Sequence, residues 1–396
     1  MKICIIASRL FTGGFTTSMV NMIHALEKQN VNVDVLFLEP DKHEYNVEDY
    51  IQNHIIPFRL QKLDRKDILR RLQIKKIDAN ITKLKEKINK EKDNKAIEKL
   101  NVENVQYLIL RAVLAYMPKI DLTGYDSVIS WEELTCNYFL AYNVKAKKKI
   151  GYVHPDYVLS KFSKEVDEPV FKKLDKIVSV SKGTLETMKK VFPEMKEKMI
   201  YIPNVNNVEK IRAKANENIE TFEKSAFDIV TVCRLSIYHK GLDRLLRIAK
   251  RLEEDKIEYN WYIVGEGDGR KEMEEYITAN DIQNVHLVGN RENPYPYMKK
   301  ADLFALQSNY EGRPVVVDEA IIIGTPVLVT NFESAKEQVK EEYGYVIEMD
   351  EEKIYNKIKD IITNPEQLEV KKKYLKEMDM RRYENVDKML EMIKEG

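Results

Sequence analysis

The chain has 396 residues, and at about 100–200 residues per domain this length predicts two domains. Hydrophobic residues make up 43% of the chain, enough to build buried cores, which excludes an intrinsically disordered protein. The 65 lysines and arginines are balanced by 65 aspartates and glutamates, so the formal net charge of zero argues against a nucleic-acid partner.

The first predicted elements are a buried strand, a glycine-containing loop and a helix. Residues Lys2–Ser8 are apolar enough for a strand covered on both faces. This run is too short for a secretion signal, and Arg9 ends it. The following loop contains Gly13 and Gly14, two adjacent glycines that let a backbone come close to a ligand. Thr17–Gln29 then carries apolar residues at helical spacing.

A basic segment interrupts the first half of the chain. Between Arg59 and Asn101 there are 15 lysines and arginines against 7 aspartates and glutamates. Apolar residues three and four positions apart form a heptad pattern from Ile74 to Ile88. We therefore expect a basic helical hairpin inserted at about residues 60–115, which packs on the first domain. A less favoured interpretation makes it a basic surface for anionic lipid or for an acceptor that carries phosphate.

Short apolar runs alternate with helical patterns along the rest of the chain, which predicts parallel α/β sheets. The series starts afresh near residue 228, after a polar stretch from Asn206 to Ser225 that we expect to connect two Rossmann-like domains. Residues from Asn364 onward are helical in pattern. Further strands are predicted at Val33–Leu38, Ser127–Trp131, Lys149–Val153, Lys176–Val180, Met199–Ile202, Asp228–Cys233, Tyr259–Val264, Val285–Val288, Leu303–Leu306, Val327–Thr330 and Tyr345–Ile347.

The cysteines and the hydropathy pattern indicate in which cellular compartment the protein works. Cys4, Cys136 and Cys233 are far apart and form no CxxC pair, which fits a reduced compartment and makes a zinc site improbable. The longest apolar stretch, Pro314–Val329, contains two carboxylates, so we expect no membrane span. These features predict a cytoplasmic protein, with peripheral contact to the inner face of a membrane left open.

Two glutamates eight positions apart, Glu311 and Glu319, lie where a predicted strand leads into an apolar helix. Carboxylates accept hydrogen bonds from sugar diols, and ligands of such sheets bind beyond the carboxyl ends of the strands. Arg234 and Lys240 flank another strand-to-helix loop, which ends in Gly241. Such a pair can bind a diphosphate, because Arg gives bidentate contacts and Lys a mobile charge. Taken singly, each feature also fits ordinary helix-start acids and solvated loop cations.

Two further loops hold candidate residues. The turn from Gly265 to Gly269 has GxGxG spacing rather than GxGxxG and lies deep in the chain, which disfavours a nicotinamide-binding dehydrogenase. It shapes a nucleotide pocket or only a tight corner. His154 directly follows a predicted strand. A lone histidine is more often structural, but a strand-end position favours a site.

Together these residues resemble glycosyltransferase family 4, the retaining enzymes of the GT-B fold. The resemblance runs from the Gly13–Gly14 loop to about residue 350. The chain departs from the family's G-R-L-x-x-x-K-G pattern by Cys233 in place of Gly and by one extra residue before Lys240. The matching motifs are Glu-x7-Glu at Glu311 and Glu319, Arg234-Leu235 with Lys240-Gly241, V-G-x-G-x-x-R at Val264–Arg270, and His-x-Asp at His154 and Asp156.

The resemblance implies an N-terminal acceptor domain of residues 1–206, a nucleotide-sugar donor domain of residues 207–378, and a helix at residues 379–396 that crosses back to the first domain. It implies that Arg234 and Lys240 hold the donor diphosphate, that Glu319 binds the ribose and Glu311 the sugar, and that His154 lies near the reaction centre. The other implied donor-binding residues are Gly13, Gly14, Gly265, Ser308, Tyr310, Gly312, Arg313 and Pro314.

The expected activity is transfer of a hexose or N-acetylhexosamine, most often from a UDP-sugar, with retention of configuration. The acceptor would be a glycan, a lipid-linked glycan or a protein, in bacterial surface polysaccharide or glycoconjugate synthesis. No Asp-x-Asp occurs in the chain and the Arg–Lys pair can stabilise the leaving group, so we expect neither a metal nor a cofactor.

Three alternatives remain. A nucleotide-sugar 2-epimerase shares the fold, although the loop from Arg234 to Lys240 and the Glu-x7-Glu spacing favour transfer. An inactive partner subunit of another transferase is disfavoured because Arg234, Lys240, Glu311 and Glu319 are all present. A coiled-coil scaffold would explain only the segment from Ile74 to Ile88.

Overall fold

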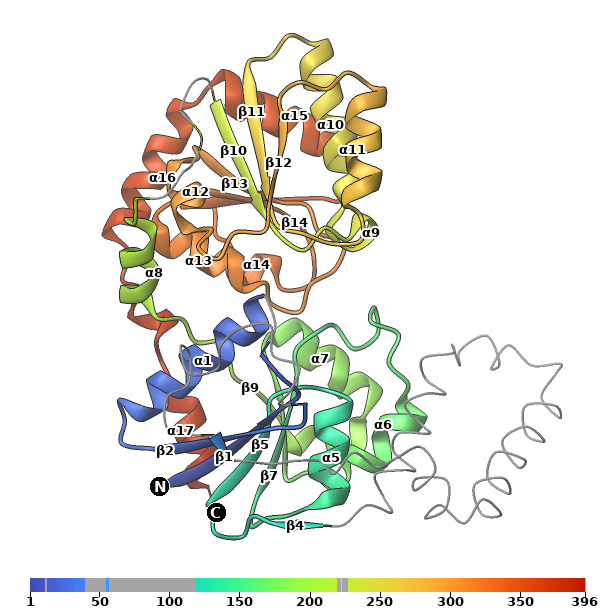
Figure 1. The fold of residues 1–396 in the computed structure, drawn as a ribbon, viewed down its shortest axis with the longest axis vertical. Helices are drawn as coiled ribbons and strands as arrows, with labels where there is room; N and C mark the ends of the chain where they lie inside the picture. Colours follow the sequence, from blue (N-terminus) through green and yellow to red (C-terminus); the bar gives the residue numbers. More distant parts are fainter. Residues whose placement is uncertain (11–12, 40–54, 57–118, 219–221, 223–226, 396) are drawn as a thin grey trace, which may run out of the picture.

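The computed structural model describes residues 1–10, 13–39, 55–56, 119–218, 222 and 227–395. They form two α/β domains, one above the other in Figure 1, each built on a parallel sheet. The expected basic hairpin at about residues 60–115 lies outside the described residues.

The first domain has a seven-stranded parallel sheet in the order β3-β2-β1-β5-β7-β8-β9. Strands β1 and β5 near its centre are buried except for Lys2 at the start of β1, which explains why the two strands together contain mainly apolar residues. The strands are β1 (Lys2–Ala7), β2 (Asn32–Phe37), β3 (Ile55–Ile56), β5 (Ser127–Ser130), β7 (Lys149–Val153), β8 (Lys176–Ser179) and β9 (Met199–Tyr201), with a separate pair β4 (Ile120–Asp121) and β6 (Val144–Lys145). The helices are α1 (Gly14–Glu27), α5 (Thr135–Asn143), α6 (Lys164–Phe171), α7 (Lys182–Val191) and the 3-10 helix η4 (Pro193–Lys198).

The second domain has a six-stranded parallel sheet in the order β12-β11-β10-β13-β14-β15. Its strands are β10 (Phe227–Val232), β11 (Tyr259–Val264), β12 (Val285–Gly289), β13 (Leu303–Leu306), β14 (Val327–Thr330) and β15 (Gly344–Ile347). Its helices are α8 (Val208–Ala215), α9 (Ile237–Lys240), α10 (Leu242–Glu254), α11 (Arg270–Ala279), α12 (Tyr295–Lys300), α13 (Val315–Ile323), α14 (Ala335–Gln338), α15 (Glu351–Thr363) and α16 (Glu366–Glu377).

The predicted strands are all present, with ends that differ by one residue at most. The stretch from Asn206 to Ser225, predicted as the connection between the domains, lies between the last strand of the first sheet and the first strand of the second, and it contains helix α8. Asn207 caps this helix by accepting a hydrogen bond from the Lys210 N–H at 2.9 Å, and Val208 and Ile211 are buried. The apolar residues of this segment are too few to give a clear helical periodicity in the sequence. The Asn207 cap and the burial of the few apolar residues nevertheless stabilise a helix of two turns.

The chain passes between the domains twice. The Asn206 N–H donates to the Tyr383 carbonyl at 2.7 Å, so the two crossing segments are hydrogen-bonded to each other. The second crossing contains the 3-10 helix η5 (Met380–Tyr383) and leads to helix α17 (Asp387–Lys394), which packs against the first domain (Figure 1). Met389 and Ile393 of α17 lie in the same hydrophobic cluster as strands β1 and β2.

Each sheet has one point where the strand order reverses. In the first domain the chain runs from β1 outward to β3 and then returns to β5 on the other side of β1. In the second domain it runs from β10 to β12 and returns to β13. Crevices form at such switch points, beyond the carboxyl ends of the two strands, and they are where open α/β sheets bind ligands.

Candidate functional site

At the second-domain switch point, the loops after β10 and β13 are joined by an ion pair. The Lys240 ammonium lies 2.5 Å from Glu311 Oε1, and the side chains are only 15% and 10% exposed. The Ser308 hydroxyl donates to the same oxygen at 2.6 Å. Burial lowers the pKa of Lys240, but the charge of Glu311, its hydrogen bond and smaller contributions from neighbouring groups together outweigh burial, and the pKa ends above its ordinary value. Lys240 is therefore a fixed cation at this crevice.

The two loops are held in register by further contacts. The His239 ring stacks on Tyr310 with centroids 4.3 Å apart, and its Nε2 lies 3.0 Å from the Tyr310 carbonyl. Arg244 donates to the Gln307 carbonyl at 2.6 Å. Gly241 has φ +61°, and a Cβ there would lie 2.2 Å from the same carbonyl oxygen. A glycine is needed at this position for both reasons.

Arg234, the other predicted diphosphate ligand, is much more open. Its side chain is 75% exposed, and its guanidinium lies 3.7 Å from Asp268 of the glycine-rich turn. A surface pair at this distance contributes little free energy. Arg234 thus lies beside the same crevice as Lys240, and exchanging Asp268 for a bound ligand would cost little free energy.

Gly265 has a structural reason to be glycine. Its φ is +144°, and a Cβ there would lie 1.9 Å from the Cys233 carbonyl oxygen. The glycine-rich turn therefore packs directly on the end of β10, and Gly269 N–H donates to the Leu235 carbonyl at 2.8 Å. This contact supports the tight-corner interpretation of the turn. Its predicted role in donor binding stays a prediction.

Glu319 lies within α13 and is almost fully buried. One of its carboxylate oxygens accepts a hydrogen bond from the Tyr295 hydroxyl at 2.8 Å. Burial raises the pKa of Glu319 to about 7, and the bond from Tyr295 offsets only part of this. No cation among the described residues pairs with Glu319; a buried carboxylate of this kind is costly, and a functional requirement would explain it.

Arg313 has a different environment from the other predicted donor-binding residues. Its guanidinium lies 3.2 Å from Asp318 and 3.6 Å from Glu337, with 9% of the side chain exposed. Its carbonyl accepts from Asn204, which belongs to the first crossing. The neighbouring Pro314 carbonyl accepts from Gln338 at 2.8 Å. In this structure Arg313 is thus part of a buried charge network beside the crossing.

In the first domain, His154 follows β7 and lies among aromatic rings. Its Nε2 is 2.7 Å from the Trp131 carbonyl, and its ring centroid is 4.9 Å from that of Phe15. Burial lowers the pKa of His154 to about 4, so the imidazole is neutral at pH 7. A carbonyl can only accept, so Nε2 carries the proton and Nδ1 is left as an acceptor.

Two residues at this face were missed in the sequence, Glu132 and Glu133. Glu132 accepts hydrogen bonds from the backbone N–H and the hydroxyl of Ser8 at 2.6 and 2.7 Å. Glu133 accepts from the His154 N–H at 3.4 Å, and burial raises its pKa to about 7. Leu134 has φ +57°, rare for a leucine. Two consecutive glutamates directly after a buried strand were the available signal.

The two switch points meet across the domain boundary. A Cβ on Gly312 would lie 1.7 Å from the His154 carbonyl oxygen. A Cβ on Gly14, the first residue of α1, would lie 3.1 Å from Val315 at the start of α13. Gly13, with φ +139°, precedes α1. The structure therefore brings together residues that the sequence places about 150 to 300 positions apart.

The described residues offer neither a metal cluster nor a membrane-spanning helix. They contain no group of three or more His, Cys, Asp or Glu side chains placed to hold a metal ion. Across the same residues, no helix is both long enough and apolar enough to span a bilayer.

A comparison with family models matches residues 213–378 to "Glycosyl transferases group 1". This range includes β10 to β15, with the loops that hold Arg234, Lys240, Glu311 and Glu319. The glycosyl transferases group 1 match therefore covers the whole of the crevice at the switch point of β10 and β13.

Relatives of known name agree with the glycosyl transferases group 1 match. An uncharacterized glycosyltransferase of Methanocaldococcus jannaschii is 25% identical over 271 residues, which are 64% of this chain and 66% of that protein. An N-acetylgalactosaminyltransferase of Campylobacter jejuni that acts on a diphospho-undecaprenol-linked glycan is 31% identical over 188 residues, 46% of this chain and 49% of that one. The alignments thus span about half to two thirds of these relatives. The family domain and the named relatives support a transferase enzyme.

Solved structures show the same fold over the whole chain. HepE of Anabaena, in complex with UDP and glucose, superposes with a TM-score of 0.65 at 14% identity and covers 100% of both chains. TarM of S. aureus, in complex with fondaparinux, alpha-GlcNAc-glycerol and UDP, has a TM-score of 0.65 at 14% identity and covers 99% of both. At such low identity the likeness shows the fold alone, which is GT-B.

Proposed function

We propose that this protein transfers a hexose or N-acetylhexosamine from a nucleotide-sugar to a glycan acceptor, with retention of anomeric configuration. The observation that carries the proposal is the ion pair of Lys240 and Glu311 at the second-domain switch point, with Arg234 beside it. This combination offers two cations to a diphosphate and a carboxylate to sugar hydroxyls. The match of residues 213–378 to the glycosyl transferases group 1 model supports the same activity.

The chemistry follows from the charge that develops when the glycosyl–diphosphate bond breaks. Negative charge grows on the leaving diphosphate, and positive charge on the sugar ring. Lys240 is held in place before the reaction, so it stabilises the leaving group with little reorganisation. Arg234 is free to move onto the diphosphate when the donor binds. These two cations are the reason to propose a reaction that needs no metal.

Retention is proposed through attack on the same face of the sugar that the diphosphate leaves, with the leaving phosphate accepting the proton of the acceptor hydroxyl. His154 is neutral and buried, which suits a hydrogen-bonding partner of the sugar better than a charged group. The contact between Gly312 and the His154 carbonyl brings the two domains together next to the proposed sugar site. It would exclude water from the bound donor.

UDP is the proposed nucleotide, since solved GT-B neighbours contain UDP or UDP-glucose. A glycan acceptor, free, lipid-linked or on a protein, is proposed from relatives whose names describe glycan synthesis. We place the reaction in the cytoplasm, a proposal supported by three free cysteines. Peripheral membrane contact is also proposed, on the basic sequence between Arg59 and Asn101.

The test is calorimetric titration of the protein with UDP, GDP and ADP in the presence of a chelator. We expect one nucleotide to bind, and the Arg234→Ala, Lys240→Ala double variant to lose most of that affinity. The matched control is Lys250→Ala with Lys271→Ala, two lysines that pair with glutamates of their own helices, α10 and α11. Binding that is the same in both double variants would refute the assignment of the diphosphate site.

A second measurement separates transfer from its alternatives. Labelled donor is incubated with and without glycan acceptors, and the product is examined by NMR. Transfer requires the acceptor and yields a product with the anomeric configuration of the donor. Isomerised or hydrolysed donor without acceptor would indicate a 2-epimerase, and no turnover with nucleotide bound would indicate an inactive partner subunit. The named relatives do not favour either alternative.

A further inference from the structure

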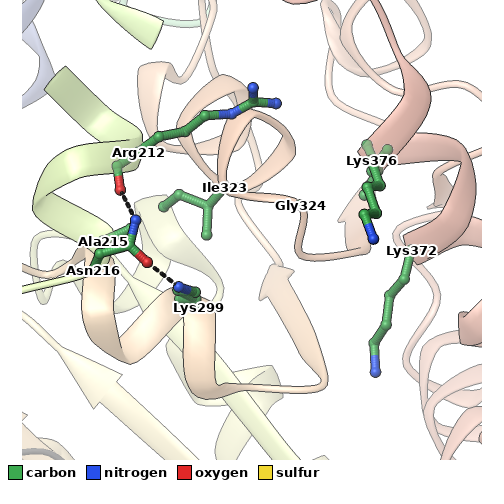
Figure 2. Close-up of a pocket in the computed structure, with 9 residues that line it drawn as sticks. Arg212, Ala215, Asn216, Lys299, Ile323, Gly324, Lys372 and Lys376 are labelled. Atoms are coloured by element: carbon green, nitrogen blue, oxygen red, sulfur yellow. Dashed lines mark hydrogen bonds between the residues drawn. The ribbon is translucent and has the colours of Figure 1, made fainter. Parts of the chain in front are cut away.

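A second concave site lies away from the crevice, on the side of the second domain where the crossing segments enter it. The cavity has a volume of about 420 Å³ and is bounded by α8, α12, the turn after α13, and α16 (Figure 2). Ala215 and Leu375, both buried, form part of its floor together with Ile323. The remaining lining residues are Arg212, Asn216, Lys299, Gly324, Lys372 and Lys376.

The charge of this lining is all of one sign. Four of the nine lining residues are Arg or Lys and none is acidic, in a chain whose net charge is zero. Lys372 is partly neutralised, by Glu369 at 2.9 Å and Asp302 at 3.6 Å. Arg212, Lys299 and Lys376 form no ion pair with another described residue.

The hydrogen bonds of the lining orient two of these cations without neutralising them. Arg212 Nε donates to the Ile322 carbonyl at 3.0 Å, which leaves its terminal nitrogens for a ligand. The Lys299 ammonium donates to the side-chain carbonyl of Asn216, and Asn216 in turn donates to the Arg212 carbonyl at 2.7 Å (Figure 2). Both partners of the cations are neutral.

Like charges around one concave surface repel each other, and an anion bound between them removes this repulsion. Arg and Lys together are the usual partners of phosphate oxygens, Arg through its paired donors and Lys as a point charge. We propose that this cavity is a second anion site, separate from the donor crevice, and that it binds a phosphate group.

The cavity lies next to both chain segments that link the two domains, so a ligand bound there would affect how the domains are connected. Helix α8 follows the first crossing and α16 precedes the second, and the cavity lies between them. A ligand that contacts Arg212 on α8 and Lys376 on α16 connects the two segments that link the domains. Helix α13 ends at this cavity, and its other end follows the Glu311 loop.

The test uses full-length protein with Arg234→Ala and Lys240→Ala, so that phosphate binding at the donor crevice is removed. Sodium pyrophosphate and inorganic phosphate are titrated in turn by calorimetry at constant ionic strength. We expect saturable binding that Lys299→Gln with Lys376→Gln weakens at least tenfold. Lys299→Arg with Lys376→Arg, which keeps the charge, should retain binding. Lys196→Gln with Lys271→Gln removes two exposed lysines elsewhere and should change nothing.

A second arm distinguishes a soluble phosphate from a lipid headgroup. The same variants are sedimented with vesicles of phosphatidylglycerol or of phosphatidylcholine. Retention by phosphatidylglycerol alone, lost in the Lys299→Gln, Lys376→Gln variant, would identify the phosphate as part of a lipid. If neither the soluble anions nor the anionic vesicles bind in a way that depends on Lys299 and Lys376, the proposal is wrong. That result would leave the nucleotide titration of the donor crevice unaffected.

Discussion

Gly312 and His154 are in backbone contact across the two domains, since a Cβ on residue 312 would lie 1.7 Å from the His154 carbonyl oxygen. Each follows a strand of its own sheet, and each is itself a candidate site residue. The contact therefore fixes the distance between the two faces on which the proposed reaction depends.

Gly312→Ala should hold the two domains apart. The added methyl has no space next to a backbone carbonyl, so the loop or the domain must shift. We expect kcat/KM to fall by about 10²-fold, because misplacement of reacting groups by about 1 Å has effects of this size. The comparison is Gly124→Ala, where a Cβ meets no atom within 4 Å. Equal kcat/KM values for the two variants would show that this contact is not needed.

The Lys240–Glu311 pair should show strong coupling in a double-mutant cycle. Lys240→Met or Glu311→Gln alone leaves a mostly buried group without its partner, and each should lower the free energy of unfolding by about 2–4 kcal/mol. The double variant should lose clearly less than the sum of both, which urea unfolding measures. Additive losses would mean that the pair is not coupled. Transfer should fall by about 10²–10³-fold in Lys240→Met.

Glu319→Gln should raise the free energy of unfolding and lower the affinity for the donor. Burial raises the pKa of Glu319 to about 7 from 4.5, so the wild type loses stability as the pH rises between these values. At pH 8 the glutamine variant should be more stable by about 3 kcal/mol at most, and at pH 5.5 by about 1 kcal/mol. Donor affinity should fall at both pH values if Glu319 binds the ribose. A stability difference that does not change with pH would contradict the raised pKa.

His154 should stay neutral in the folded protein down to about pH 5. Its pKa is about 4, below the ordinary value of 6.5, so folding is opposed by protonation of the unfolded state as the pH falls below 6.5. Between pH 7 and pH 5 the wild type should lose about 2 kcal/mol more unfolding free energy than His154→Gln. NMR of labelled histidine gives an independent reading, and a titration midpoint near 6.5 for His154 would refute the prediction.

The regular parts of the chain, the buried strands and the motif-bearing loops, could be predicted from hydrophobic periodicity and motif order. The central strands were predictable because their residues are buried on both faces, and the loops after β10 and β13 because their residue types suit phosphate and sugar. Helix α8 was not, because three buried residues and an asparagine cap make a short signal. The alternation of buried strands with helices also predicted two Rossmann-like domains, but not the contacts between them.

Contacts between distant segments could not be predicted from local pattern. Arg313 lies two positions after Glu311 in the sequence, but its guanidinium pairs with the buried Asp318 and the partly buried Glu337. Nothing in its immediate sequence distinguishes that partner from a ligand. Glu132 and Glu133 become site candidates only when β5 is known to lie next to β1 and β7.

Helix α17 places Met389 and Ile393 in the core of the first domain, beside strands β1 and β2, which precede this helix by about 350 residues in the chain. The ribosome therefore synthesises the whole second domain before the first domain can receive its last apolar side chains. Until then, an emerging first domain exposes the surface that α17 covers, and so would a recombinant fragment limited to residues 1–206. Folding of the two domains is thus linked in time, because the core of the first domain is complete only after the second domain has been synthesised.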